Sequence, residues 1–321
     1  MNLPSRRQPR VQFWGLVAAA GILATLPTVA TLGARHWWVL DLTSHFRLQY
    51  LIGLSVLALL LGMGRRWGAL AVVSAALLLN TAVVLPLYAS AKPVAVAGEP
   101  TVRLLLSNVL TGNDQFAKVR DLIRAADPDL VALQEVDLRW ETALAELADR
   151  YPHRVAQPRG DNFGIMLLSK LPLEDRQVLD LADIGVPSIW VRFRLAGQPV
   201  RLLTSHPIPP SSAAGTACRN RQLAAVAATL RAEAGPRILI GDLNTSPWSP
   251  VFRQVCAAAG LRDSAQGWGI QPTWPTMSVW FRVPIDHCLV SPELIVRDRV
   301  VGPDVGSDHF PLLVTLALRR E

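Results

Sequence analysis

The chain has 321 residues, 50% of them hydrophobic and 18% charged, and its three scattered cysteines exclude a disulfide-stapled scaffold and a cysteine-rich metal cluster. The net charge is +7, but this excess lies in residues 1–98, where eight basic residues accompany one acidic residue. Residues 99–321 contain 24 residues of each sign, so the high pI does not indicate a nucleic-acid-binding surface.

Three apolar runs dominate the first part of the chain, at residues 11–33, 48–64 and 67–88. A helix of about 20 apolar residues crosses a bilayer, so these runs predict about three transmembrane helices and a membrane anchor over residues 1–88. A cleavable signal peptide is the alternative for the first run, because three arginines precede it. The two further apolar runs favour the anchor.

The arginines beside the apolar runs predict the orientation of the anchor. Five of them lie before the first run or between the second and third, whereas Arg35 and Arg47 lie on the other side, in an aromatic-rich loop at residues 34–47 that suits the headgroup layer. The side richer in arginine and lysine usually remains in the cytoplasm. We therefore expect a multi-pass protein of the cell (inner) membrane with a cytoplasmic N-terminus. A linker at residues 89–100, rich in small residues, would then lead to a domain outside the cytoplasm.

Residues 101–321 have the pattern of one globular domain. Short apolar runs predict β-strands at residues 102–108, 129–135, 189–195, 200–206, 237–242, 284–290 and 311–318. Amphipathic segments at 114–126 and 219–233 predict helices between the strands. Strands mixed with helices indicate an α/β or α+β domain with β-sheets in its core.

Polar residues stand at or near the ends of these strands. They are Asn108, Glu135, His206, Asp242, Asn244, Asp286, Asp308 and His309. Each of them alone is most simply a turn or packing residue. Strand ends in such folds meet at one edge, where ligands bind. Together these carboxylates, amides and imidazoles therefore predict a site for a hard divalent cation with acid–base groups beside it.

The sequence blocks that carry these residues follow a specific order. They read LLSNVL, VALQEVD, TSHPIPP, IGDLNTSP, PIDHCLVS and GSDHFPLLV. In this order they resemble the signature blocks of the endonuclease/exonuclease/phosphatase superfamily, over about residues 101–318. The resemblance implies a four-layer sandwich of two mixed β-sheets flanked by helices. It also implies hydrolysis of phosphate esters with Mg²⁺, for which Mn²⁺ can substitute.

The resemblance further implies roles for individual residues. Glu135 would be the principal metal ligand, assisted by Asn108 and Asp308. Asp242 would position or deprotonate the attacking water, and Asn244 would hold a phosphate oxygen. These roles agree with the chemistry of phosphate esters, whose cleavage depends on positioning and charge stabilisation.

The two histidines have separate implied roles. His309 would contact the phosphoryl group and would be oriented by Asp286. His206 matches an additional histidine of the deoxyribonuclease, sphingomyelinase and inositol-phosphatase branches, which makes the abasic-site endonuclease branch a poorer fit. Weaker candidates for phosphate binding, each with a solvated helix face or a turn as the alternative, are Arg219, Arg221 and Asn162.

The predicted function is that of a membrane-anchored, divalent-metal-dependent phosphoesterase whose partners are a phosphate-ester substrate and the lipid bilayer. A lipid-like or small phosphodiester is preferred over nucleic acid, because the site stays near the bilayer and residues 99–321 are neutral. The alternatives are a surface or periplasmic nuclease acting on DNA or RNA, and a catalytically inactive binding or sensing domain. No protein partner follows from the sequence. Cys218 and Cys256 are expected near the same end of one strand, either bridged or as free buried thiols.

Overall fold

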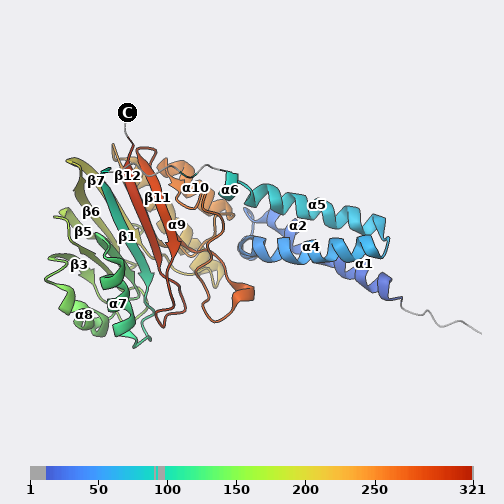
Figure 1. Ribbon diagram of the computed structural model, residues 1–321, viewed down its shortest axis with the longest axis horizontal. Coiled ribbons are helices and arrows are strands. Elements are labelled where there is room, and N and C mark those ends of the chain that lie inside the picture. The colour runs from blue at the N-terminus through green and yellow to red at the C-terminus, as the bar shows by residue number, and fades with distance from the viewer. Residues whose placement is uncertain (1–11, 90–91, 93–97, 320–321) are drawn as a thin grey trace, which may run out of the picture.

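The N-terminal part of the protein is a bundle of helices (Figure 1). The computed structural model describes residues 12–89, 92 and 98–319, so most of the predicted linker at 89–100 lies outside the described residues. The helices of the bundle are α1 (Phe13–Ala24), α2 (Leu26–Ala30), α3 (Trp38–Thr43), α4 (Arg47–Met63), α5 (Trp67–Val84) and α6 (Pro86–Ala89). They make three stretches long and apolar enough to cross a membrane, at Phe13–Gly33, Trp38–Met63 and Trp67–Val84.

The second stretch begins earlier than its apolar run predicts. The expected loop at 34–47 is largely helical, because α3 and the short 3₁₀ helix η2 (Ser44–Phe46) continue directly into α4. Polar side chains that interrupt the apolar pattern here are buried instead of solvated, among them Asp41 and His45. A pattern based on hydropathy ends at such residues, whereas the backbone keeps its helical hydrogen bonds across them.

A polar network cross-links the bundle. The Arg47 Nη1 donates to the Asn80 Oδ1 at 2.7 Å, and the Asn80 Nδ2 donates to the Thr28 Oγ1 at 2.8 Å. These three side chains come from α4, α5 and α2 and are buried. Because buried polar groups are costly unless they are paired, the network specifies how the helices align.

The remainder of the described chain folds around two six-stranded sheets. The first sheet has the strand order β11 (Leu294–Val301), β12 (Leu312–Leu318), β1 (Thr101–Asn108), β2 (Leu130–Gln134), β4 (Ile165–Ser169), β3 (His153–Gln157). The second has the order β5 (Glu174–Leu179), β6 (Ser188–Leu195), β7 (Gln198–Ser205), β8 (Arg237–Asp242), β10 (Asp286–Val290), β9 (Arg262–Asp263). One pair in each sheet is parallel, β1 with β2 and β7 with β8, and the other pairs are antiparallel, so both sheets are mixed.

The core lies between the sheets because alternate residues of each strand face inward. Leu104 and Leu106 of β1 belong to the same buried cluster as Ile238 and Ile240 of β8, whereas Leu105 packs on the opposite face. Helices α7 (Phe116–Ala126) and α8 (Leu138–Leu144) cover the outer face of the first sheet. Helices α9 (Ala213–Arg231) and α10 (Pro250–Ala259) cover the second. The structure confirms the predicted four-layer sandwich preceded by apolar helices.

The bundle packs directly on this sandwich. The Leu87 carbonyl accepts hydrogen bonds from the N–H groups of Gly267 and Gly269 at 2.8 and 3.0 Å, and Leu87 shares a buried apolar cluster with Trp248. Asp41 of α3 bonds the Arg219 guanidinium of α9 at 2.9 Å. The helical bundle and the sandwich are therefore joined by hydrogen bonds, an ion pair and apolar contacts.

Candidate active site

Gln134 fastens the two sheets together at the edge where the candidate residues gather. Its Nε2 donates to the carbonyl oxygen of Ser205 at 2.8 Å, and its Oε1 accepts from the Asp242 N–H at 2.8 Å. Gly241 leaves room for this bridge, since a Cβ there would lie 2.0 Å from the Ser205 oxygen and 2.6 Å from the Gln134 Nε2. The ends of β2, β7 and β8 are thus held within hydrogen-bonding distance of one another.

Glu135 and Asp242 approach each other from opposite sheets, with Asn108 between them. The Asn108 Nδ2 lies 2.9 Å from the Glu135 Oε1 and 3.4 Å from the Asp242 Oδ2. Glu135 has a φ of 61°, a left-handed conformation that is uncommon for a residue with a side chain. Its Oε2 also accepts a 3.3 Å hydrogen bond from the Thr111 N–H. Local backbone strain thus points a buried carboxylate at the space between the strand ends.

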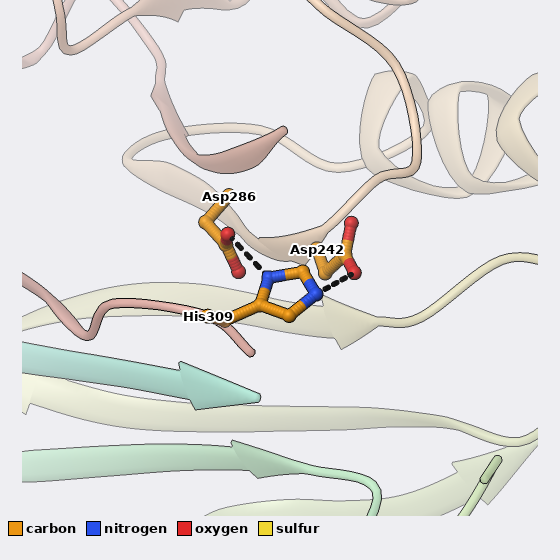
Figure 2. Close-up of side chains that lie close together, drawn as sticks. All are labelled: Asp242, Asp286 and His309. Atoms are coloured by element: carbon orange, nitrogen blue, oxygen red, sulfur yellow. Dashed lines mark hydrogen bonds and ion pairs between the residues drawn. The ribbon is translucent and has the colours of Figure 1, made fainter. Parts of the chain in front are cut away.

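His309 lies between two carboxylates (Figure 2). Its Nδ1 is 2.8 Å from the Asp286 Oδ2, and its Nε2 is 3.6 Å from the Asp242 Oδ2. The His206 Nε2 lies 3.5 Å from the same Asp242 oxygen. Asp286 and Asp242 face each other as a residue pair of β10 and β8, which explains why the two carboxylates flank one ring.

The charges of these groups stabilise one another. Burial by itself lowers the pKa of His309, but the carboxylates of Asp286 and Asp242 outweigh it and raise this pKa to about 10. Burial likewise opposes ionisation of Asp242, yet His309 and His206 hold the pKa of this carboxyl below its usual value. An imidazolium beside an ionised aspartate is therefore the favoured state at neutral pH.

Asp308 and Asn244 complete the cluster. The Asp308 Oδ2 accepts a 3.0 Å hydrogen bond from the Trp274 Nε1, whereas its Oδ1 is buried with no hydrogen-bond partner among the described residues. The Asn244 N–H donates to the Asp242 Oδ1 at 2.9 Å, and its Nδ2 donates to the Pro207 carbonyl at 2.9 Å. Both side chains line the same pocket.

That pocket has a volume of about 550 Å³, within the usual range for small-molecule sites. Its polar lining residues from the sandwich include Glu135, Asn162, His206, Asp242, Asn244, Asp308 and His309. Asn108 and Asp286 lie behind this lining, where they bond Glu135 and His309. The structure thus brings together eight strand-end candidates, and Asn162 joins them.

The two arginine candidates lie elsewhere. Arg219 is fully buried, with its guanidinium bonded to Asp41 and, at 3.0 Å, to the Asn244 carbonyl, so it is not available to a phosphate. Arg221 is exposed two residues further along α9, and its Nη2 lies 3.4 Å from the Cys218 Sγ. Neither arginine lines the pocket. The sequence around an arginine near the start of a helix does not show whether its guanidinium binds phosphate, faces solvent or pairs with a distant carboxylate.

All three cysteines are free thiols, so the bridge considered for Cys218 and Cys256 is not formed. Both are partly buried, on α9 and α10, which pack against each other. Burial raises the pKa of the Cys256 thiol.

The donor set fits a hard divalent cation. Glu135 and Asp308 offer oxygen ligands, whereas Asn108, predicted as a ligand, turns its Nδ2 toward Glu135 and its Oδ1 toward the Leu110 N–H, so it positions Glu135. The unpartnered Asp308 Oδ1 is a buried acceptor that needs a cation or a proton donor. Asp242, Asp286 and His309 also lie close enough together to hold a metal ion. However, Asp286 and Asp242 raise the pKa of His309, and a protonated imidazole has no lone pair for a metal, so we favour the oxygen ligands around Glu135.

Comparison with known proteins assigns the chain to a family. Residues 105–309 match the model of the Endonuclease/Exonuclease/phosphatase family. The chain belongs to this family. Members of the endonuclease/exonuclease/phosphatase family are usually hydrolases of phosphodiester bonds. No curated protein sequence is significantly similar to the chain.

Solved structures share the fold at low sequence identity. The human Nocturnin catalytic domain with bound sulfate is 18% identical, with a TM-score of 0.58 over 70% of this chain and 97% of that one. TDP2 from D. rerio in complex with a single-strand DNA product is 19% identical, with a TM-score of 0.57 over 67% and 98%. An endonuclease/exonuclease/phosphatase from Beutenbergia cavernae is 23% identical, with a TM-score of 0.54 over 68% and 72%.

Several residues that shape the site were not singled out in the sequence. Gln134 precedes Glu135 in the VALQEVD block, and its position before a strand-end carboxylate was the available signal. Leu42, His45 and Phe46 of the bundle also line the pocket. Nothing local in the sequence could reveal them, because they meet the site only through tertiary packing.

Proposed function

We propose that the protein is a membrane-anchored, divalent-metal-dependent phosphoesterase that hydrolyses phosphodiester bonds. The observation that carries the proposal is the convergence of Glu135, Asp242 and His309 from separate strand ends on one pocket. A binding or sensing domain has no need for an imidazolium held between two carboxylates, and this argues against the inactive alternative.

Each side chain has a defined task in this proposal. Mg²⁺ held by Glu135 and Asp308, with Asn108 orienting Glu135, would neutralise charge on the phosphate oxygens. Asp242, ionised because its pKa is held low, accepts a hydrogen bond from the attacking water and takes up its proton. His309 supplies positive charge to the phosphoryl group and gives the proton of its Nε2 to the leaving oxygen, while Asp286 holds its Nδ1–H.

His206 and Asn244 assist from the pocket wall. The His206 Nε2 faces the same Asp242 oxygen as His309, so it is a second donor next to the phosphoryl group. The Asn244 amide nitrogen uses one hydrogen for the Pro207 carbonyl, which leaves the other for a phosphate oxygen. Both add hydrogen bonds without placing another negative charge near the substrate.

We also propose that the N-terminus lies in the cytoplasm and the catalytic domain outside it, on the cell (inner) membrane. Within the described residues, three helical stretches have the length and apolar character to cross a bilayer, and an odd number of crossings separates the two ends. Arg65 and Arg66 lie in the turn between α4 and α5, the side that the arginine bias assigns to the cytoplasm.

The decisive test is turnover of bis(p-nitrophenyl) phosphate, a soluble phosphodiester, by the full chain in detergent. We expect turnover that requires Mg²⁺ or Mn²⁺. Glu135→Gln and His309→Ala should each reduce it by about 10²–10³-fold, the usual effect of losing one charge-stabilising group. Arg221→Gln, on the exposed face of α9, is the matched control. Undiminished turnover in excess EDTA would contradict the proposal, and so would a folded protein without turnover.

A further inference from the structure

The pocket that holds the candidate active site is completed by the membrane segment. Leu42, His45 and Phe46 line it together with Phe163, Val283 and Ile285 of the catalytic domain. The pocket therefore combines an apolar lining with the polar residues of the candidate site. The His45 side chain is 6% exposed, and its Nδ1 has no hydrogen-bond partner among the described residues. This part of the wall therefore offers a polar group that the fold itself does not use.

An apolar loop stands beside this pocket. Its large hydrophobic side chains are strongly exposed, at 90% for Met277, 66% for Val279, 73% for Trp280 and 63% for Phe281. The pocket residues Trp274 and Val283 pair as an antiparallel bridge at its base. In Figure 1 this orange loop projects on the side of the domain that carries the bundle. A cluster of exposed aromatic and aliphatic side chains marks an interaction surface.

The apolar loop (residues 277–281) is tied to the second membrane-spanning stretch. The Gln49 Nε2 of α4 donates to the Arg282 carbonyl at 2.9 Å, directly after the loop. The Arg282 Nη2 donates back to the Thr276 carbonyl at 2.9 Å, and its guanidinium lies 4.6 Å from the centre of the Phe310 ring. The loop is thus held at the level of Gln49.

The length of α4 sets this level relative to a bilayer. Helix α4 has 17 residues. At a rise of about 1.5 Å per residue it spans roughly 25 Å, less than the hydrocarbon thickness of about 30 Å. The helical stretch continues back to Trp38, so it is long enough to pass through the whole layer. If it crosses the bilayer and ends at the Arg65–Arg66 turn, a hydrocarbon layer of about 30 Å covers about 20 residues and ends near Ser44. Gln49, Phe46 and the apolar loop then lie in the outer part of the hydrocarbon layer, next to the headgroups, where tryptophan is favoured.

We propose that the substrate is a lipid of the bilayer that carries a phosphate ester in its headgroup, and this rests on the proposed phosphoesterase function. The headgroup phosphate binds among the polar residues of the candidate site. The acyl chains of the lipid lie along Leu42 and Phe46 and continue into the membrane. Water attacks phosphorus and gives a proton to Asp242, the P–O bond to one alcohol breaks, and that alcohol leaves with the proton of the His309 Nε2. The apolar loop inserts its aromatic side chains into the boundary and keeps the mouth against the bilayer.

The test separates lipid recognition from chemistry. The full chain is reconstituted into vesicles of phosphatidylethanolamine, phosphatidylglycerol and cardiolipin, and release of headgroup or phosphate is measured. Turnover of bis(p-nitrophenyl) phosphate is measured on the same preparations. The double variant Trp280→Ser/Phe281→Ser removes the two aromatic anchors. Leu138→Ser is the matched control, because Leu138 is 69% exposed and lies at the start of α8.

We expect the wild type to cleave vesicle lipid. The loop variant should lose at least about tenfold of that activity, since burying one large apolar side chain is worth about a factor of ten or more in partitioning. Its turnover of the soluble diester should stay unchanged, which also shows that it folds, and Leu138→Ser should retain both activities. Equal lipid cleavage by the loop variant would overturn the proposal. Nicking of plasmid DNA by a wild type that releases nothing from the vesicles would overturn it as well. Absence of turnover of the soluble diester would instead count against the proposed phosphoesterase function.

Discussion

The ion pair between Asp41 and Arg219 joins the helical bundle to the two-sheet sandwich, and the effect of removing it can be predicted quantitatively. The Arg219 side chain is fully buried, and that of Asp41 is 7% exposed. Asp41 also accepts a 2.7 Å hydrogen bond from the Ser249 hydroxyl. The Asp41→Asn variant leaves the Arg219 guanidinium buried without a counter-charge. Breaking a buried pair in this way costs about 3–5 kcal/mol of folding free energy.

The Asp41→Asn substitution should also affect the candidate active site. Arg219 donates to the Asn244 carbonyl at 3.0 Å, and the Asn244 N–H donates to the Asp242 Oδ1 at 2.9 Å. Asp41 is therefore linked to Asp242 through two intermediates. We expect Asp41→Asn to lower kcat for the soluble diester as well as stability, because the segment after β8 loses one of its anchors.

The assay is thermal unfolding of the full chain in detergent, followed by tryptophan fluorescence and by residual activity. A loss of about 3–5 kcal/mol corresponds to a fall of roughly 6–20 °C in Tm for a domain of this size. Arg219→Met should be similarly destabilising, since it leaves the Asp41 carboxylate unpaired. The double variant should lose less than the sum of the single variants, because neither charge remains. Strictly additive losses, or single variants within about 0.5 kcal/mol of wild type, would refute this reasoning.

Two further predictions concern proton transfer and topology. Because Asp286 and Asp242 raise the pKa of His309 to about 10, the protonated acid persists below that pH and is lost above it. Asp286→Asn lowers this pKa, so the alkaline limb of the pH–rate profile for the soluble diester should move to lower pH, and an unmoved limb would remove His309 as the acid. An alkaline phosphatase fused after Glu321 should be active outside the cytoplasm, and a cytoplasmic location of the fusion would mean that one apolar stretch does not cross.

Much of the candidate site could be predicted because its residues lie at the ends of short apolar runs, which are visible in the sequence. Strands such as residues 102–108 and 237–242 are buried on both faces, so they appear as apolar runs, and the polar residue that ends each run is conspicuous. Asn108 and Asp242 were found in this way. Five strands of the described chain were not predicted, namely β3, β4, β5, β9 and β11. Of these, β3 and β5 lie at sheet edges and carry exposed charge, which hides their pattern, whereas β4 is fully buried.

By itself, the sequence determined the apolar helices, the mixed α/β class and the polar residues that meet at the strand ends, because each depends on hydropathy, periodicity or a short block. Only the tertiary structure decided that Arg219 pairs with Asp41, 178 residues away, and that Phe46 forms a wall of the pocket. It also placed the apolar loop at the level of α4. Local patterns record whether a side chain is buried or polar, but its partner is chosen by the packing of distant segments, and no short stretch of the chain contains that information.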